Sequence, residues 1–369
     1  MILTILLFVV LLILFLWENY QHQKNLKKVP VRILVNGTRG KTTVARLVCA
    51  SLNAKGIRTL GRTTGSEAEI IYPDGHVEPF VRKRKATILE MKAIFRLANK
   101  EQVDALVIEC MALTPENQRT MGRNLVRPTH VLITNSYIDH VAEMGPSLEE
   151  TIYALSQSVG KDSKLYVTED YYGKTPCASL TVTKTPLPVT FDTPIKIHPS
   201  GYALSLALLK DFGVGVEDIE KGVKTILPDI GLHEMFQGKN GAHLIPTFSV
   251  NDLHCMDLTV KDALSQYPGK RILLVYNNRQ DREYRIQLMD QVIRRNREHI
   301  AGVIVIGDYR WKVKTWFRRL KVSVRSADTE SLYREIEEKS DEYVYVGLGN
   351  IKGRGEGLLS YFLKEEKHA

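Results

Sequence analysis

The feature that most constrains the fold is a strand, a glycine loop and a helix start that follow one another in one short stretch. The segment VRILVNGTRGKTTVARLV runs from Val31 to Val48: an apolar, β-branched run comes first, Gly37 and Gly40 bracket a loop, and Lys41 opens a helical pattern. Glycines let backbone amides approach an anion, and a helix dipole adds positive charge at its N-terminus. The pattern predicts a phosphate-binding loop, and the alternative is a glycine-rich turn that binds nothing.

The loop is shorter than the common phosphate loop. A G-x-x-x-x-G-K-[ST] frame would need glycine at position 35, where Val35 stands, whereas the frame here is G-T-R-G-K-T and starts at Gly37. In this frame Lys41 would neutralise phosphate charge, and the Thr42 hydroxyl could ligate Mg²⁺.

Length and composition indicate two globular domains. The chain has 369 residues, of which 44% are hydrophobic and 25% charged. Apolar runs at 31–35, 103–109 and 129–135 predict buried parallel strands, Gly56 closes the first helix, and a helical pair is expected at 201–227. The pattern restarts with strands at 242–250, 271–277, 301–307 and 342–349 and helices at 283–298 and 329–340. We expect an α/β fold, with a mainly parallel central domain at 31–228 and a smaller Rossmann-like domain at 229–369.

The N-terminal segment stands apart because it carries no charge from Met1 to Trp17. It is about as long as the shortest bilayer spans, and it lacks the basic start and small-residue end of a signal peptide. We expect a transmembrane anchor at 1–17 and a polar linker at 18–30. Lys24, Lys27 and Lys28 follow the apolar run, so the positive-inside rule predicts a single-pass protein of the cell membrane, with both globular domains in the cytoplasm. The alternative is a buried core helix.

Cysteines and charge exclude some classes of protein. The scattered residues Cys49, Cys110, Cys177 and Cys255 indicate reduced thiols rather than disulfides or a zinc site. The net charge of +9 is concentrated at 82–85 and 310–325. Such runs are most often solvated helix faces, the alternatives being contact with an anionic membrane or a polyanionic substrate. No motif supports binding of nucleic acid.

Two further strand ends carry residues that suit a phosphate site. Glu109 ends one apolar run, and ligands bind at the carboxyl ends of parallel strands, so it is a candidate metal ligand; the alternative is a helix cap. The next strand ends in TNSYIDH, which places Asn135, Asp139 and His140 over the same edge. His140 is a second candidate ligand, the alternative being an ordinary surface histidine.

As a set, these motifs resemble the central domain of the Mur ligase superfamily, whose loop usually reads G-T-N-G-K-T. Arg39 replaces that asparagine. The chain is similar to one branch of this superfamily in particular. The segments that carry this similarity are GRTTGSEA at 61–68, ECMAL at 109–113, DHVAEMGPSLEE at 139–150 and VGLGNIKG at 346–353. That branch is the ATP-binding subunit of poly-γ-glutamate synthase, the PgsB/CapB family.

The resemblance implies a membrane-anchored, ATP-dependent amide ligase that polymerises glutamate into poly-γ-glutamate through an acyl phosphate, as in capsule biosynthesis. Its cofactors would be ATP and Mg²⁺. Its substrates would be glutamate and the growing polyglutamate chain, and its partners small membrane subunits of the synthase complex. The alternatives are another Mur-type amide ligase, of the folylpolyglutamate or cell-wall precursor type, and a non-catalytic ATP-binding regulator of a membrane complex.

The resemblance also assigns residues. Thr42 and Glu109 would share one Mg²⁺, and His140 would hold a second; Lys41 is catalytic with them, and Arg39 either adds charge near the acyl phosphate or faces solvent. The residues expected to contact the nucleotide are Gly37, Thr38, Arg39, Gly40, Lys41, Thr42, Thr43 and Asn135, together with Asp252 and Arg279 from the second domain. The stretch at 152–159 lacks the carbamylated lysine common in Mur ligases, and Ser200 stands near where many members have an adenine-contacting asparagine.

Overall fold

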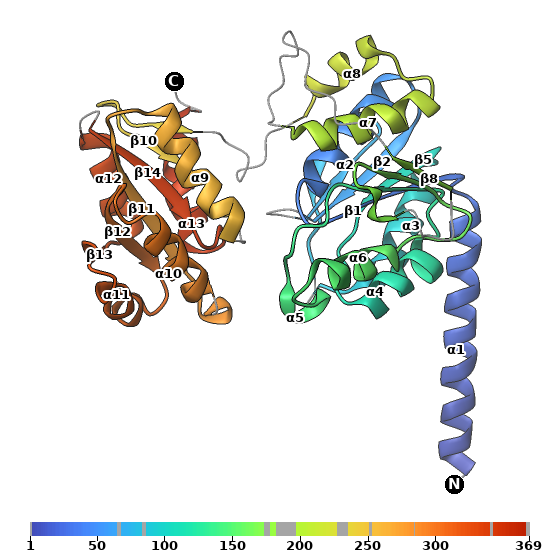
Figure 1. Ribbon diagram of the computed structural model, residues 1–369. Helices are drawn as coiled ribbons and strands as arrows, with labels where there is room; N and C mark the ends of the chain where they lie inside the picture. Colours follow the sequence, from blue (N-terminus) through green and yellow to red (C-terminus); the bar gives the residue numbers. More distant parts are fainter. Residues whose placement is uncertain are drawn as a thin grey trace. The chain divides into compact units, whose positions relative to one another are not determined.

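The computed structural model describes residues 2–64, 68–82, 86–172, 178–181, 197–226, 235–250, 253–283, 285–339 and 342–366. The chain divides into two compact units, Met1–Leu227 and Pro228–Ala369. Each unit has its own sheet with helices on both faces (Figure 1). The expected fold class, a mainly parallel α/β fold in two parts, is confirmed. The predicted boundary at 228 lies outside the described residues.

The sheet of the N-terminal unit has eight strands in the order β4-β3-β2-β5-β1-β6-β7-β8. The pairs from β2 to β8 are parallel, and β3 and β4 add an antiparallel edge. The strands are β1 (Val31–Asn36), β2 (Thr59–Thr63), β3 (Glu69–Ile71), β4 (Val77–Pro79), β5 (Ala105–Glu109), β6 (His130–Ile133), β7 (Lys164–Val167) and β8 (Ala178–Thr181).

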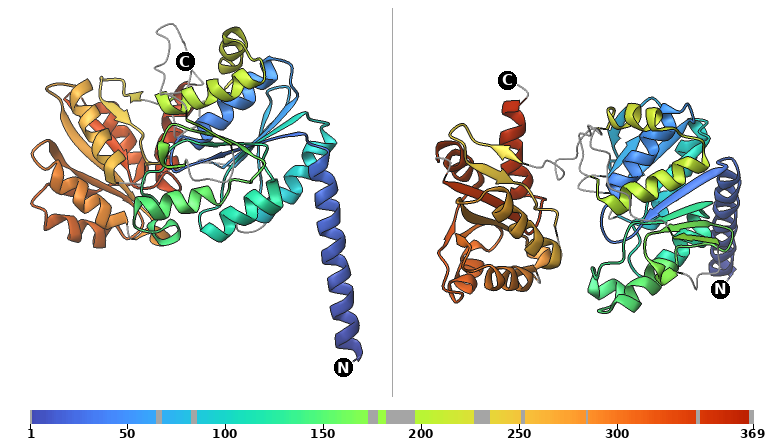
Figure 2. Two further views of the ribbon diagram at one scale, coloured as in Figure 1. Left: turned by 45° about the vertical axis from the view of Figure 1, so that its right-hand side comes forward. Right: turned by 45° about the horizontal axis from the view of Figure 1, so that its top comes forward.

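Helices cover both faces of this sheet. Helix α2 packs with α7 and α8 on one face, while α3, α4 and α6 lie on the other, as Figures 1 and 2 show. The central strands are buried on both faces, which is why they read as continuous apolar runs. The helices are α1 (Ile2–Lys27), α2 (Lys41–Ala54), α3 (Met91–Lys100), α4 (Pro115–Thr120), α5 (Val141–Met144), α6 (Leu148–Ser156), α7 (Pro199–Asp211) and α8 (Val216–Val223).

Helix α1 has an exposed apolar N-terminal part and a C-terminal end, here called its base, that packs against the rest of the unit. It is long and apolar enough to cross a membrane, and none of its most apolar window is buried. Figure 2 shows its N-terminal part projecting away from the rest of the unit. The segment predicted as a polar linker, 18–30, is helical as far as Lys27, because α1 continues to that residue. The reason is packing: Leu26 joins the core of the unit, and the buried His22 ring lies against Phe95, with its Nε2 2.9 Å from the carbonyl oxygen of Leu125.

The C-terminal unit has a six-stranded sheet in the order β13-β12-β11-β14-β10-β9. All pairs are parallel except β9 with β10. Helices α9 to α11 pack on one face and α12 and α13 on the other. The strands are β9 (Phe236–Gln237), β10 (His243–Ile245), β11 (Arg271–Asn278), β12 (Ile300–Gly307), β13 (Val324–Ser326) and β14 (Tyr343–Leu348), and the helices are α9 (Leu253–Gln266), α10 (Arg285–Arg295), α11 (Arg310–Arg318), α12 (Thr329–Glu338) and α13 (Arg354–Glu366).

The predicted long apolar strands are all present, with shorter bounds in places. The strand expected at 242–250 ends at Ile245, since Pro246 has no amide to continue a ladder. The basic run 310–325 includes α11, whose Val313 and Phe317 are buried while Lys312 and Arg318 are exposed, so part of the run is a solvated helix face. Among the described residues, Cys49, Cys110 and Cys255 form no disulfide bond, and Cys177 lies outside those residues.

Candidate active site

The predicted phosphate loop joins β1 to α2 at the carboxyl edge of the sheet. Gly37 has φ +120° and Gly40 has φ +77°, and α2 begins at Lys41 as expected. Gly40 is the N-cap, so within the described chain no side chain caps the first amides of α2. Uncapped amides at a helix N-terminus form an anion site.

The two glycines are needed for different reasons. A Cβ at Gly37 would lie 2.2 Å from the Thr134 hydroxyl oxygen, because the loop packs closely against the end of β6. A Cβ at Gly40 would meet nothing within 4 Å. Gly40 therefore borders open space at the α2 N-terminus, which is where a phosphate group would be held.

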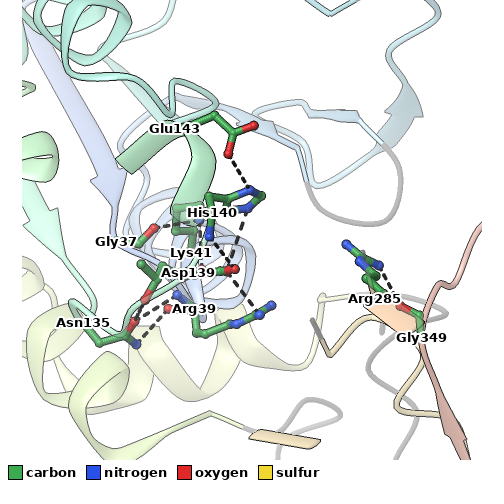
Figure 3. Close-up of polar contacts among 10 residues, drawn as sticks. Gly37, Arg39, Lys41, Asn135, Asp139, His140, Glu143, Arg285 and Gly349 are labelled. Atoms are coloured by element: carbon green, nitrogen blue, oxygen red, sulfur yellow. Dashed lines mark hydrogen bonds and ion pairs between the residues drawn. The ribbon is translucent and has the colours of Figure 1, made fainter. Parts of the chain in front are cut away.

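The Lys41 side chain folds back over the loop. Its Nζ donates to the carbonyl oxygens of Gly37, at 2.7 Å, and of Thr38, at 3.2 Å (Figure 3). Burial lowers the pKa of Lys41, and the Glu109 carboxylate opposes that shift by favouring the charged form. Because Lys41 is half-buried, water screens its charge less than it would screen an exposed cation, so the ammonium interacts more strongly with an incoming polyanion.

Glu109 lies next to the loop because β5 pairs with β1 in parallel, with Glu109 opposite Val35. The side chain is 4% exposed. Its Oε2 accepts hydrogen bonds from the Thr42 hydroxyl at 3.0 Å and from the Thr64 backbone amide at 2.6 Å. The alternative role as a helix cap is wrong, since α4, the next helix, is capped by Thr114.

Asn135 holds the loop in shape. Its Oδ1 accepts from the Thr38 hydroxyl at 2.6 Å and from the Arg39 amide at 2.9 Å, and its Nδ2 donates to the Arg39 carbonyl at 3.1 Å (Figure 3). The Thr134 hydroxyl donates to the same carbonyl at 2.5 Å. The Asn135 side-chain amide therefore forms its hydrogen bonds with the loop and holds the loop in place. A direct contact between Asn135 and a nucleotide stays a prediction.

Arg39 and His140 meet at the same carboxylate. One Asp139 oxygen lies 3.2 Å from an Arg39 guanidinium nitrogen and 3.8 Å from His140 Nε2, and His140 Nδ1 lies 4.0 Å from a Glu143 oxygen (Figure 3). The Arg39 side chain is 24% exposed and packs toward this group, so the alternative that it simply faces solvent is wrong. Burial lowers the pKa of His140, with Asp139 opposing, which favours the neutral ring that can bind a metal.

The residues fit a nucleotide with a hard divalent cation. Within the described ranges no three His, Cys, Asp or Glu side chains gather as a preformed metal site. Mg²⁺ typically takes only one or two protein oxygens and completes its shell with phosphate and water. Thr42 and Glu109 supply such an oxygen pair beside the helix N-terminus. The observed contacts of His140 are with Asp139 and Glu143, and its role at a second metal stays a prediction.

The C-terminal unit carries the two remaining predicted contacts. Asp252 lies outside the described residues. Arg279 pairs with Asp281 at 2.7 Å, and its contact with nucleotide stays a prediction. The buried Arg285 donates to the Gly349 carbonyl at 2.7 Å (Figure 3). Gly349 has φ +103°, so this glycine makes a turn at the end of β14.

Sequence reasoning assigned no role to three groups that shape the site: the Thr64 amide, the Thr134 hydroxyl and the Asp139 carboxylate. Thr64 lies in the GRTTG segment, and the other two lie in the TNSYIDH segment after β6. Both segments stand out as motifs in the sequence, so the sequence indicates that they belong to the site. It does not show which of their atoms contact Glu109, Arg39 or His140, because these contacts depend on the three-dimensional arrangement.

The comparisons with known proteins agree with this site. Residues 35–175 match the Mur ligase middle domain, and residues 232–365 match the C-terminal domain of the poly-γ-glutamate synthase CapB. Two curated relatives cover most of the chain. PGA synthase CapB of Bacillus subtilis is 26% identical over 95% of this chain and 94% of its own, and capsule biosynthesis protein CapB of Bacillus anthracis is 25% identical over 97% and 82%.

Solved structures share the fold. A bifunctional folylpolyglutamate synthase/dihydrofolate synthase from Yersinia pestis, complexed with AMPPNP and Mn ion, superposes with a TM-score of 0.67 at 15% identity, covering 95% of this chain and 92% of its own. The UDP-N-acetylmuramate-alanine ligase MurC of Thermotoga maritima gives 0.59 at 14% identity, covering 95% and 78%.

The fold and the phosphate site define this class of protein as an ATP-dependent amide ligase of the Mur type. The chain belongs to the Mur ligase superfamily, close to the CapB proteins of poly-γ-glutamate synthesis.

Proposed function

We propose that the chain is a membrane-anchored ligase that extends poly-γ-glutamate, using ATP to activate a carboxylate as an acyl phosphate. The observation that carries the proposal is the Thr42 hydroxyl 3.0 Å from Glu109, beside a half-buried Lys41 at an uncapped helix N-terminus. The two CapB relatives support the choice of glutamate and of a capsule polymer.

The chemistry needs positioning and charge neutralisation. A free carboxylate is a poor electrophile, and phosphoryl transfer from ATP makes it reactive toward an amine. The loop amides from Gly37 to Thr43 and the Lys41 ammonium hold the β- and γ-phosphates and offset their charge. Arg39, fixed by Asp139, adds positive charge beside the acyl phosphate, and amine attack then releases inorganic phosphate and leaves a new amide.

Thr42 and Glu109 would hold one Mg²⁺, and His140 would contribute to a second. When bound, these ions neutralise phosphate charge and orient the γ-phosphate toward the substrate carboxylate. The protein's part is to hold the Glu109 carboxylate at the loop and to keep His140 neutral. The Thr42 hydroxyl and the Thr64 amide fix the Glu109 carboxylate by two hydrogen bonds, and burial lowers the pKa of His140 and so disfavours its protonation.

The α1 helix would anchor the ligase by a single pass. Its apolar part from Ile2 to Trp17 is exposed, and Lys24 and Lys27 lie in its last turns, which favours a cytoplasmic catalytic unit. Because the base of α1 packs into the unit, the active site would be held at a fixed height above the bilayer. Small membrane subunits of a synthase complex would then meet the ligase at its membrane-facing end.

The test is phosphate release by the full-length protein in detergent with Mg²⁺-ATP, with and without its membrane partners. Each of the twenty amino acids is supplied in both enantiomers. We expect stimulation by glutamate and formation of a growing acidic polymer. Lys41→Ala should abolish turnover, whereas Lys55→Ala, at the exposed far end of the same helix, should not.

Two outcomes would redirect the proposal. Stimulation by a folate or cell-wall precursor in place of glutamate would indicate another Mur-type ligase. Tight ATP binding without turnover, with all partners present, would indicate a regulator. His140→Ala separates a ligase from an ATP-binding regulator. Loss of turnover in this variant, with its affinity for ATP intact, would favour a catalytic role over nucleotide sensing.

A further inference from the structure

A cavity in the C-terminal unit lies outside the phosphate site. Its volume is about 630 Å³, a size that suits a ligand larger than a single amino acid. It opens at the carboxyl ends of β12 and β13, where α11 and α13 begin. The lining residues are Gly307, Asp308, Tyr309, Arg310, Trp311, Lys314, Ser326 and Arg354.

The cavity is strongly electropositive. Arg310, Lys314 and Arg354 supply three cations, and Asp308 is the one acid in the lining. Asp308 is already engaged, since its Oδ2 accepts from the Gln280 amide at 3.0 Å. The wall therefore carries an excess of positive charge.

Cations at these places work against the helices that carry them. Arg310 and Arg354 are the first residues of α11 and α13, where the helix dipole is positive and favours acids. Arg310 and Lys314 are also like charges four residues apart on one helix, an unfavourable pair. Such a conflict between local preference and placement is typical of binding sites, because a bound anion would relieve it.

Two cations near the cavity, Arg325 and Lys312, are paired with acids, whereas two of the cavity cations are not. Arg325 makes a two-pronged pair with Glu335, at 2.6 and 2.5 Å, and Lys312 lies 3.5 Å from Glu283. In the part of the chain that the structure describes, neither Lys314 nor Arg354 forms an ion pair or a side-chain hydrogen bond. Arg310 is held by a 2.9 Å hydrogen bond to the Ala327 carbonyl, which keeps it at the wall.

Two aromatic residues complete the lining. Tyr309 is 41% exposed and Trp311 is 74% exposed. Their rings offer apolar surface for methylene groups, while the indole N–H and phenol O–H can bond to amide carbonyls. A γ-linked glutamate chain presents these groups in alternation: free carboxylates, amides and methylene pairs.

We infer that this cavity binds the acidic polymer, several γ-glutamyl units at a time, and holds the growing chain on the enzyme between additions. The cations pair with its carboxylates, and the aromatic side chains pack against its backbone. This inference rests on the proposed function, because it takes poly-γ-glutamate as the product.

The experiment measures binding of a synthetic γ-linked glutamate decamer to the full-length protein in detergent, by the change in tryptophan fluorescence. The test variant is Lys314→Gln with Arg354→Gln. The control is Arg294→Gln with Arg334→Gln, which removes the same charge from exposed pairs on α10 and α12. We expect the test variant to bind the decamer about tenfold more weakly or worse, and the control to stay within about twofold of wild type.

Three results would overturn the inference: equal loss in both variants, free glutamate binding as tightly as the decamer, or an oligonucleotide of equal charge binding as tightly. Glutamate-dependent phosphate release is measured on the same wild-type sample. Turnover without decamer binding would refute the cavity's role alone. Decamer binding without glutamate-dependent turnover would refute the proposed function and leave the polymer site standing.

Discussion

Replacing Glu109 by glutamine separates a catalytic carboxylate from a structural one. In the folded chain Glu109 Oε2 accepts from the Thr42 hydroxyl and the Thr64 amide, and a glutamine oxygen at the same point can accept both bonds. The hydrogen bonds to a neutral glutamine are weaker than those to the carboxylate. This loss is offset because the folded state no longer buries a negative charge. We therefore expect unfolding free energy to change by about 1 kcal/mol or less, and Tm by no more than about 4 °C.

Activity should respond very differently. Glu109→Gln removes the carboxylate that would hold Mg²⁺ together with Thr42, so the ion that offsets the charge of the phosphates would bind more weakly. Loss of one such group typically costs about 10²–10³ in kcat, or about 3–4 kcal/mol. The Mg²⁺ concentration for half-maximal turnover should also rise. The assay is phosphate release with glutamate, titrated with Mg²⁺, alongside a thermal melt.

Glu90→Gln is the matched control. The Glu90 side chain is 10% exposed and pairs with the buried Arg62 at 2.9 Å and with Arg82 at 2.8 Å. Weakening a buried pair should cost about 2–4 kcal/mol and lower Tm by roughly 5–15 °C, while the folded enzyme keeps its turnover. The reasoning is refuted if Glu109→Gln stays within about threefold of wild-type kcat, or if the control loses turnover equally.

Three other predictions follow from the N-terminal unit. Gly37→Ala should disrupt ATP binding and cost more than 2 kcal/mol in a denaturant titration, because an added Cβ would overlap Thr134, just after β6. Gly40→Ala should cost only about 1 kcal/mol of backbone strain, and equal costs for the two variants would contradict the packing described. Leu26→Ala should cost about 2–5 kcal/mol in the same titration, since this residue of α1 lies in the core; no loss would mean that the helix base is undocked. Burial lowers the pKa of both His22 and His130 below the ordinary value of 6.5, so the unfolded chain takes up protons first and stability should fall as pH drops below about 6.5. Tm measured against pH should therefore show a shallower acid slope in a His22→Gln, His130→Gln variant, and an unchanged slope would refute the assignment.

Much of the site could be predicted from the sequence because the relevant signals are local. The β-branched run before Gly37 and the Lys-Thr-Thr after Gly40 specify a strand, a loop and a helix start whatever lies elsewhere. Continuous apolar runs predicted the buried strands β5 and β6, and the rule that ligands bind at strand carboxyl ends predicted that Glu109 and Asn135 would lie near the loop. The structure brings both there.

Other parts could not be predicted from local pattern. The strands β3, β4 and β9 are only two or three residues long. Such short segments cannot show the alternation of apolar and polar residues from which a strand is predicted. The base of α1 was predicted as a linker because its sequence is polar, but His22 and Leu26 are four residues apart and lie on one helix face, where the unit covers them.

The sequence by itself determined the chemistry that the chain carries: a phosphate loop, two strand-end ligand candidates, an apolar N-terminal helix and clustered cations. Only the tertiary structure decided which groups meet. It turned Arg39 onto Asp139, set the Thr64 amide on Glu109, and collected Arg310, Lys314 and Arg354 around one cavity. The reason is physical: residue type and spacing fix local conformation through sterics and burial, whereas contacts between distant segments depend on strand order and register, which arise only when the whole sheet is assembled.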